Sequence, residues 1–545
     1  MRCAALLFLL PTLAFAQDVP SLQRPNPALP ITESFETLRG RLGKAGGPFA
    51  AAQLALKPGG EAILQASKES KDPLVRLDAT YGLSLIDTHS ARRALGYLMG
   101  DPDPRVAGEA YVNFRRLRNR EYDLLREIAL HGNEQAGTSV MWLAEGPMAG
   151  SLVLEVAKTP GAGGRDAALA RLGLSDPSMI PVFESAAHEA RLNVAATAVR
   201  SLLYNRKSAA GQAALDRLLH APDLSPRIAL ATALEQDYSS SNWPIMVALL
   251  RDPSPAVRLK LADVLVDNLF GSGRVTASLP YIARLVDDPV PAVGDQAVKR
   301  LGEYAQDRVA QRESLGWASS PAAPKLRLGA AKRLQGPLAF HAALILALLG
   351  DHRAYPALFE RAHGGDRQEV AIMALGLLGD RRATPFLLGL TDHPAYRGNA
   401  FVALGFLRDP STVPFLLKLV REHPRDDGIM AAYALGRMGD RSVTPALLAI
   451  ATDPKLEPGY LLNYVEPLAM LGGPEVRKLL VKLFETVLPQ QLPIVTSALV
   501  TLKDRSVLPD LERIAAGTDV ARANEARHAA ERLRSALNSP YGTPH

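Results

Sequence analysis

Apolar residues along this chain recur at steps of three and four, in short runs separated by glycine, aspartate and proline. The runs 370–375 and 398–404 are typical, because each is rich in alanine and places its apolar side chains on one broad face of a helix. A second run, 386–390, follows the break after the first of them. The pattern therefore predicts pairs of short helices, each with one buried face, joined by turns.

The breaks contain a repeated motif, in which Leu-Gly-Asp or a close variant is followed by a proline five residues after the aspartate. Its copies begin at Leu349, Leu378, Leu407, Met438 and Leu502, with a degenerate copy at 471–473. The first four aspartates are 29 to 31 residues apart. Glycine can adopt the left-handed conformation that closes a helix, aspartate caps or turns the chain, and proline suits the first turn of the next helix. A constant period of about 30 residues is typical of stacked-repeat proteins.

The earlier half of the chain carries a second motif, Asp-Pro-x-Pro-x-Val, ahead of predicted helices with alanine near their centres. It occurs at 101–106, 252–257 and 288–293, with a shortened copy at 72–76 and a looser one at 223–228. Aspartate and proline again suit the start of a helix. This half is therefore expected to repeat the same helix pair in a degenerate form.

Together the two motifs resemble HEAT repeats, specifically the short bacterial type that also occurs in phycobilin lyases. Val257-Arg258 matches the start of the inner helix in that family, and 374–380 matches its end. The resemblance is clear over about 340–515 and weaker over 70–305. It implies an all-α fold, an α-solenoid in which antiparallel helix pairs stack into a superhelix, and it suggests a bacterial origin.

In HEAT repeats the arginine of the Val-Arg pair commonly contacts an aspartate of the neighbouring repeat. The resemblance therefore implies structural rather than ligand-binding roles for Arg76, Arg258 and Arg397. Glycine stands at the same place in two other repeats, as Gly294 and Gly428. Any ladder of arginine–aspartate contacts is expected to be interrupted there.

The N-terminus has the pattern of a secretory signal, since Arg2 is followed by an apolar core at 3–10 and a small-residue site at 14–16. We predict cleavage after Ala16 and export, to the periplasm or as a secreted protein. The core is shorter than the roughly 20 residues that span a bilayer, so no stable membrane insertion is expected. Cys3 is the only cysteine, so neither disulfides nor thiolate metal sites are expected in the mature chain.

Composition and motifs divide the chain into six predicted segments. They are a signal peptide at 1–16, a proline-rich flexible leader at 17–34, degenerate HEAT-like repeats at 35–305, an irregular connecting segment at 306–337, regular HEAT-like repeats at 338–537 and a tail at 538–545. The connecting segment is open to interpretation as a hinge, a protruding loop or a binding element. It contains Trp317, and Trp142 lies near another break. Both tryptophans are interpreted as filling gaps in the stack rather than as partner anchors.

No catalytic, cofactor-binding or metal-binding residues are predicted. The sequence has neither a Gly-x-Ser-x-Gly elbow nor a His-Glu-x-x-His zinc helix. Deoxyhypusine hydroxylases resemble this fold and bind two irons through several His-Glu pairs. This chain has one such pair, His188-Glu189, which is interpreted as a surface pair. The signal peptide argues against phycobilin lyase activity, because those enzymes act on cytoplasmic proteins.

Charge adds little to this picture. The formal net charge of +6 is small for 545 residues. The densest basic run is followed directly by acidic residues and is interpreted as a solvated helix face. It comprises Arg115, Arg116, Arg118 and Arg120. Nucleic acid is therefore not an expected partner.

The leading functional hypothesis is an exported, non-enzymatic scaffold that binds a protein partner along the solenoid surface. A signal peptide joined to a repeat array without a catalytic constellation favours it. Two alternatives stay open: an enzyme or small-ligand binder with its site at the repeat break around 306–337, and a passive envelope spacer. No partner-binding residues are predicted.

Overall fold

The computed structural model describes most of the chain outside its two ends. The described residues are 32–117, 121–145, 149–172, 177–236, 242–272, 275–311, 316–454 and 458–538. The predicted signal peptide 1–16 lies outside them, as do residues 17–31 of the predicted leader and 539–545 of the predicted tail. Cleavage after Ala16 therefore stays a prediction.

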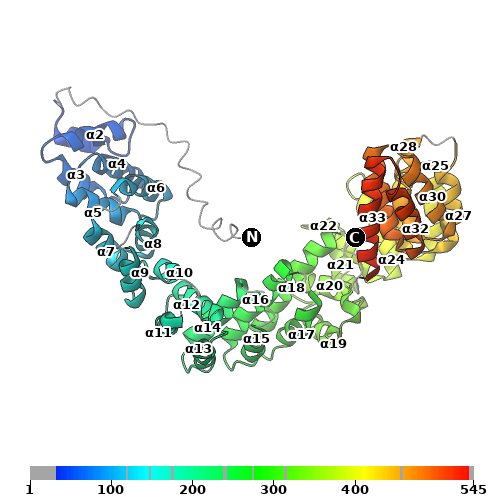
Figure 1. The fold of residues 1–545 in the computed structure, drawn as a ribbon, viewed down its shortest axis with the longest axis horizontal. Helices are drawn as coiled ribbons and strands as arrows, with labels where there is room; N and C mark the ends of the chain where they lie inside the picture. The colour runs from blue at the N-terminus through cyan, green and yellow to red at the C-terminus, as the bar shows by residue number, and fades with distance from the viewer. Residues whose placement is uncertain are drawn as a thin grey trace. The chain divides into compact units, whose positions relative to one another are not determined.

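The described residues form helices and no strands, and the helices stack in pairs (Figure 1). This confirms the predicted all-α, α-solenoid fold class. The chain divides into two compact units, 1–249 and 250–545. The division falls before the predicted connecting segment 306–337, which lies within the second unit.

The first unit is built from two layers of helices. Even-numbered helices follow one another in one layer, where α2, α4 and α6 are neighbours and α8, α10, α12 and α14 are neighbours, and odd-numbered helices form the other. The helices are α1 (Phe35–Arg41), α2 (Gly47–Leu56), α3 (Gly60–Ser67), α4 (Pro73–Ser84), α5 (His89–Leu98), α6 (Pro104–Phe114), α7 (Tyr122–His131), α8 (Glu134–Leu143), α9 (Ala149–Lys158), α10 (Arg165–Arg171), α11 (Ile180–Ala186), α12 (Leu192–Tyr204), α13 (Ala209–Leu219), α14 (Leu224–Ala233) and α15 (Trp243–Leu249).

The second unit repeats this arrangement with a more regular inner layer. In that layer α16, α18, α20, α22, α24, α26, α29, α31 and α33 follow one another as neighbours. The helices are α16 (Pro255–Ser272), α17 (Val275–Val286), α18 (Pro291–Ala310), α19 (Ala323–Ala331), α20 (Ala339–Leu348), α21 (Tyr355–Ala362), α22 (Gln368–Leu378), α23 (Thr384–Gly389), α24 (Arg397–Leu407), α25 (Val413–Glu422), α26 (Asp427–Met438), α27 (Thr444–Ala451), α28 (Pro458–Leu461), α29 (Val465–Leu471), α30 (Pro474–Thr486), α31 (Leu492–Leu502), α32 (Leu508–Ala515) and α33 (Val520–Asn538).

Small residues set the spacing of the inner layer, as the alanine-rich runs predicted. Ala371, Ala400 and Ala431 are fully buried. Gly376 on α22 faces the backbone of Ala403 on α24 so closely that a Cβ atom would collide with it. Leucine and alanine side chains therefore fill a continuous apolar layer, which repeats along the stack because each helix pair buries its face against the next.

The Leu-Gly-Asp junctions contain one element more than the sequence predicts. Gly379 ends α22 with φ 72°, the expected left-handed closure. Asp380 then caps a single 3-10 turn rather than the next α-helix, by accepting a hydrogen bond from the Arg382 amide at 3.0 Å. Pro385 follows in the first turn of α23, as predicted. The closing position tolerates other residues, since Arg408 adopts φ 52° there.

The predicted irregular segment 306–337 is largely helical where it is described. Its first residues are the last turn of α18, and its centre is α19, which packs against α17 and α20. Trp317 is 1% exposed and stacks on Tyr304 with ring centroids 6.2 Å apart. The gap-filling interpretation is therefore correct for Trp317. It is wrong for Trp142, whose side chain on α8 is 48% exposed.

Candidate functional site

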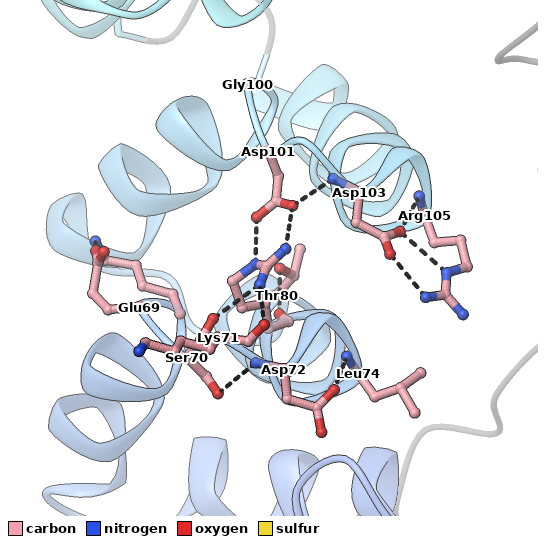
Figure 2. A network of polar contacts seen from close by, with 12 residues as sticks. Glu69, Ser70, Lys71, Asp72, Leu74, Thr80, Gly100, Asp101, Asp103 and Arg105 are labelled. Carbon is pink, nitrogen blue, oxygen red and sulfur yellow. Dashed lines mark hydrogen bonds and ion pairs between the residues drawn. The ribbon is translucent and has the colours of Figure 1, made fainter.

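The first unit holds a buried ion pair between consecutive repeats, which we call the first arginine clasp and which Figure 2 shows from close by. Arg76 of α4 donates from Nε and Nη2 to the two carboxylate oxygens of Asp101, at 2.7 and 2.8 Å. Its Nη1 donates to the backbone oxygens of Ser70 and Lys71, at 2.9 and 3.3 Å. Both side chains of the ion pair are largely buried. The bidentate geometry ties two turns that are distant in sequence into one junction.

The turn after Asp101 supports the first arginine clasp. Asp101 also accepts a hydrogen bond from the Asp103 amide at 2.8 Å, and Asp103 caps α6 by accepting one from the Arg105 amide at 2.9 Å. The Arg105 side chain bonds back to Asp103 and, with the backbone amides, lowers the pKa of Asp103 to about 2. This copy of the Asp-Pro-x-Pro motif thus places two carboxylates with different partners.

The second unit contains the same device, the second arginine clasp. Arg258 of α16 donates to the two oxygens of Asp288 at 2.7 and 3.0 Å, and to the backbone oxygen of Asp252 at 2.6 Å. Burial of the Asp288 carboxylate opposes its ionisation. The hydrogen bonds from Arg258 and from the Val290 amide outweigh that effect and, with the nearby positive charges, hold the pKa of Asp288 below its usual range. The predicted contacts of Arg76 and Arg258 with an aspartate of the neighbouring repeat are therefore confirmed.

The ladder is interrupted where glycine replaces the arginine, as predicted. A Cβ atom at Gly294 would collide with the guanidinium of Arg333, which bonds to Asp295 at 2.7 Å and occupies the space. Arg397 makes a looser contact, 3.3 Å from Asp427, with its side chain 48% exposed. That contact also joins neighbouring repeats, but it is not a buried clasp.

The second arginine clasp borders an open cavity of about 560 Å³, which we call the junction cavity. The loops before α16 and α18, the last turn of α17 and the first turn of α19 form its wall, so it collects residues from consecutive repeats. Its lining residues are Leu250, Arg251, Asp252, Pro253, Arg258, Arg284, Asp287, Asp288, Pro289 and Lys325. All of them belong to the second unit.

Three exposed cations of this lining have no ion-pair partner among the described residues. They are Arg251, Arg284 and Lys325, which we call the rim cations. The other charges are engaged: Arg258 pairs with Asp288, and Asp287 pairs with Lys332 at 2.6 Å. The N-cap of α18 is Val290, which has no capping side chain, and Asp288 just before it accepts a hydrogen bond from the Val290 amide at 2.9 Å.

The exposed cations of the junction cavity are suited to binding anions. Its lining contains arginine, lysine, aspartate, leucine and proline, and no serine, threonine, cysteine, histidine or tyrosine. The described residues of this lining therefore provide no hydroxyl or thiol nucleophile and no histidine. Within the part of the chain that the structure describes, no three His, Cys, Asp or Glu side chains gather as metal ligands.

Of the pair His188-Glu189, which the sequence predicts at the surface, His188 is exposed and the Glu189 side chain is largely buried. Glu189 accepts hydrogen bonds from Arg191 at 2.9 Å and from Arg165, which is 1% exposed. Burial opposes the ionisation of Glu189, but hydrogen bonds from Gly161 and these arginines outweigh it and lower its pKa. Glu189 is a structural carboxylate of the first unit. Its neighbour His188 lies 3.5 Å from Asp223 and is partly exposed.

The basic run of the first unit is only partly described. Arg115 and Arg116 lie exposed on a 3-10 turn after α6, in line with the predicted solvated face, whereas Arg118 and Arg120 lie outside the described residues. No described helix is both long and apolar enough to cross a bilayer.

The sequence motifs did not predict that the rim cations lie together, although the positions of these residues relative to the motifs indicate it. Arg251 directly precedes one Asp-Pro-x-Pro motif, and Arg284 lies one helical turn before the next. Lys325 follows a proline at the start of α19. A basic residue beside the same motif in successive repeats could have been read as a row on one edge of the stack. Lys325 also belongs to the segment 306–337, where the alternative hypothesis placed a ligand site.

No protein family and no curated protein matches the chain. Solved structures that it resembles include one in which Kap95p binds RanGDP, with 10% identity and a TM-score of 0.38 over 93% of this chain and 85% of the other. An importin β structure shows 12% identity and a TM-score of 0.37, covering 93% and 89% of the two chains. Kap121p shows 12% identity and a TM-score of 0.29, covering 93% and 71%. At these scores the likeness adds no argument about function.

Proposed function

We propose that this protein is a non-enzymatic scaffold of HEAT-like repeats that binds segments of partner proteins, with the junction cavity as one binding site. The observation that carries the proposal is the set of rim cations. Three exposed positive charges surround one cavity, and the described residues leave all three without an ion-pair partner. An anionic group of a ligand at this cavity would be attracted by exposed cations that have no ion-pair partner there.

The clasp beside the rim supports a binding role for the cavity. Arg258 and Asp288 are buried and satisfied by one another, which fixes the loops before α16 and α18. The rim cations are exposed and therefore free to contact a ligand without breaking the fold. A rigid wall with adaptable charged side chains is a suitable surface for a protein segment, because little ordering of the backbone is required on binding.

Export through the signal at 1–16, and the short bacterial repeat type, are also part of the proposal and rest on the sequence patterns alone. We expect expression of the full chain in a bacterium with a periplasm to give a periplasmic product that begins at Gln17, as determined by N-terminal sequencing. A cytoplasmic product that keeps Met1 would contradict this part and leave the binding proposal unaffected.

The binding proposal is tested by panning a displayed library of random peptides on the immobilised full chain. Enriched peptides are expected to cross-link to a photoreactive amino acid placed at Ala292, in the exposed first turn of α18, and not to one at Ala516, exposed after α32. Peptides that cross-link equally at both positions would indicate nonspecific adsorption and would contradict a site at the cavity. The absence of any enriched peptide would contradict the scaffold proposal.

A small-ligand binder remains the second candidate, because Lys325 of the segment 306–337 lines the cavity. It predicts that one small anion stabilises the full chain saturably at micromolar concentration, as measured by thermal unfolding. A passive spacer predicts neither peptide binding nor ligand stabilisation. Deleting 306–337 is unsuitable as a test, because the deletion would remove the packed helix α19.

A further inference from the structure

We infer that the junction cavity binds an acidic peptide segment, whose aspartate or glutamate side chains pair with the rim cations while its backbone lies across the exposed prolines of the cavity. This inference rests on the proposed function and names the chemistry of the partner. It concerns one site in the second unit and assigns to Arg251, Arg284 and Lys325 a role in binding.

The charge of the lining favours carboxylates as the groups that bind. Two of the rim cations are arginines, and a guanidinium matches the planar carboxylate with two parallel hydrogen bonds. The buried charges do not compete for the ligand, because Arg258 is held by Asp288, and Lys332 holds Asp287. The positive charge available to a ligand therefore comes from the rim cations.

The distribution of these cations favours a peptide with several carboxylates over a single small anion. Arg251 comes from the loop before α16, Arg284 from α17 and Lys325 from α19, so the three side chains start from three separate elements. A chain with acidic residues at intervals can contact all of them. Exposed Pro253 and Pro289 between the charges offer apolar surface without N–H donors, which suits the methylene groups of a peptide.

The same lining disfavours nucleic acid as the occupant. Single strands are bound by aromatic side chains on which bases stack, and no aromatic residue lines this cavity. Three aspartates also lie in the wall, where a dense row of phosphates would meet repulsion: Asp252, Asp287 and Asp288. A peptide can place carboxylates beside the cations and neutral residues beside the aspartates.

The test uses the full chain and a fluorescein-labelled peptide of twelve residues, in which glutamate alternates with leucine and proline. Its matched partner has glutamine at every glutamate position. Fluorescence anisotropy is recorded in low and in physiological salt, because screening weakens exposed ion pairs. Single variants Arg251→Gln, Arg284→Gln and Lys325→Gln and their triple combination are compared with Arg532→Gln. That control removes one charge from exposed Arg532 on α33, which makes no ion pair within the described residues.

We expect the glutamate peptide to bind and the glutamine peptide to bind at least about tenfold more weakly. Each single rim variant should weaken binding about two- to fivefold, as removal of one exposed ion pair does, and the triple variant about 10- to 100-fold. Arg532→Gln should leave the affinity unchanged. Circular dichroism and thermal unfolding confirm that the variants are folded, which separates loss of binding from loss of structure.

Three results would overturn the inference. One is equal binding of the two peptides; the second is an equal effect of Arg532→Gln and the rim variants. The third is tighter binding of a single-stranded oligonucleotide with the same sensitivity to the rim variants, which would assign the cavity to nucleic acid. If library peptides bind and cross-link at Ala292 but acidic peptides do not, the inference fails and the proposed function stands. If no peptide of either kind binds, both fail.

Discussion

In the first arginine clasp Asp101 accepts two hydrogen bonds from Arg76, and in the second Asp288 accepts two from Arg258 at nearly the same distances. Each arginine also donates to a backbone oxygen six residues before it. Each aspartate accepts one further bond from the backbone amide two residues after it. The internal bonding of the two junctions is therefore equivalent.

The surroundings of the two clasps differ in charge. Four residues before the accepting aspartate stands Tyr97 in the first clasp and Arg284 in the second. In the first clasp the cation within the motif, Arg105, is bound by Asp103 at 2.8 Å. The second clasp has Val290 at the position of Asp103, and its rim cations have no such partner.

The two clasps therefore share one structural contact and differ in the charges beside it. The clasp holds consecutive turns together at Arg76–Asp101 and at Arg258–Asp288, and the neighbouring positions differ between the two. Arg105 beside the first clasp is paired with Asp103, whereas the rim cations beside the second clasp have no ion-pair partner among the described residues. The residues for which we infer a binding role therefore flank the structural motif.

The largest expected effect comes from removing either arginine. Arg76→Ala and Arg258→Ala each leave a buried carboxylate without its partner, which costs about 3 to 5 kcal/mol. Hydrogen exchange should show the loss at α4 and α6 for the first variant and at α16 and α18 for the second. The matched control is Arg397→Ala, whose half-exposed ion pair is worth at most about 1 kcal/mol. Exchange that rises equally in both units for either variant would contradict a local clasp.

A smaller effect is expected when both partners are replaced together. Arg258→Met with Asp288→Asn removes the charges but keeps an oxygen for the Val290 amide, so the pair should lose about 2 kcal/mol less than the two single changes summed. Arg76→Met with Asp101→Asn should show a similar coupling energy in denaturant titrations. A coupling near zero in one clasp only would show that the two junctions are not equivalent.

Low pH should change the contribution of Asp103 to the free energy of unfolding by about 1 kcal/mol and leave that of Val290 unchanged. Asp103 has a folded-state pKa of about 2, below its unfolded value of about 3.9, so its contribution is present above pH 4 and is lost as the pH falls toward 2. Asp103→Ala should therefore cost about 1 kcal/mol at pH 7 and almost nothing near pH 2. Val290→Ala, at the same position of the second clasp, should show no such pH dependence, as measured by urea unfolding across this range.

The smallest effect on stability is expected at the rim of the second clasp. Arg251→Gln, Arg284→Gln and Lys325→Gln should each change the free energy of unfolding by less than about 0.5 kcal/mol, because these exposed side chains make no ion pair with described residues. Guanidinium denaturation at pH 7 measures this directly. A loss as large as that of Arg258→Ala would show that the rim cations hold the fold and would remove the argument for a binding role.

The repeat architecture was predictable from the sequence because it depends on local rules. Apolar periodicity gives the helices, and the fixed spacing of glycine, aspartate and proline gives the junctions between them. Gly379 and Pro385 stand where capping and turn preferences place them. The one-turn 3-10 helix between them was not predicted, because three residues are too few to carry a periodic pattern.

The errors at the level of single residues arise where packing decides exposure. Trp142 and Trp317 both stand near breaks in the pattern, but only Trp317 finds an aromatic neighbour, Tyr304, to cover it. The sequence predicts a surface position for Glu189, whereas in the fold α10 places the buried Arg165 beside it. Neither partner is close enough in sequence for a local motif to reveal it.

By itself the sequence determined the all-α class, the period of the stack and the arginine–aspartate clasps, since each follows from local propensity or from a motif that recurs along the chain. Only the tertiary structure showed that Arg251, Arg284 and Lys325 share one cavity. These residues are up to 74 positions apart in sequence. The stacking of consecutive repeats brings the loop before α16 and the helices α17 and α19 to one edge. Stacking places side chains together by position within the repeat, so a site emerges from residues that no single motif contains.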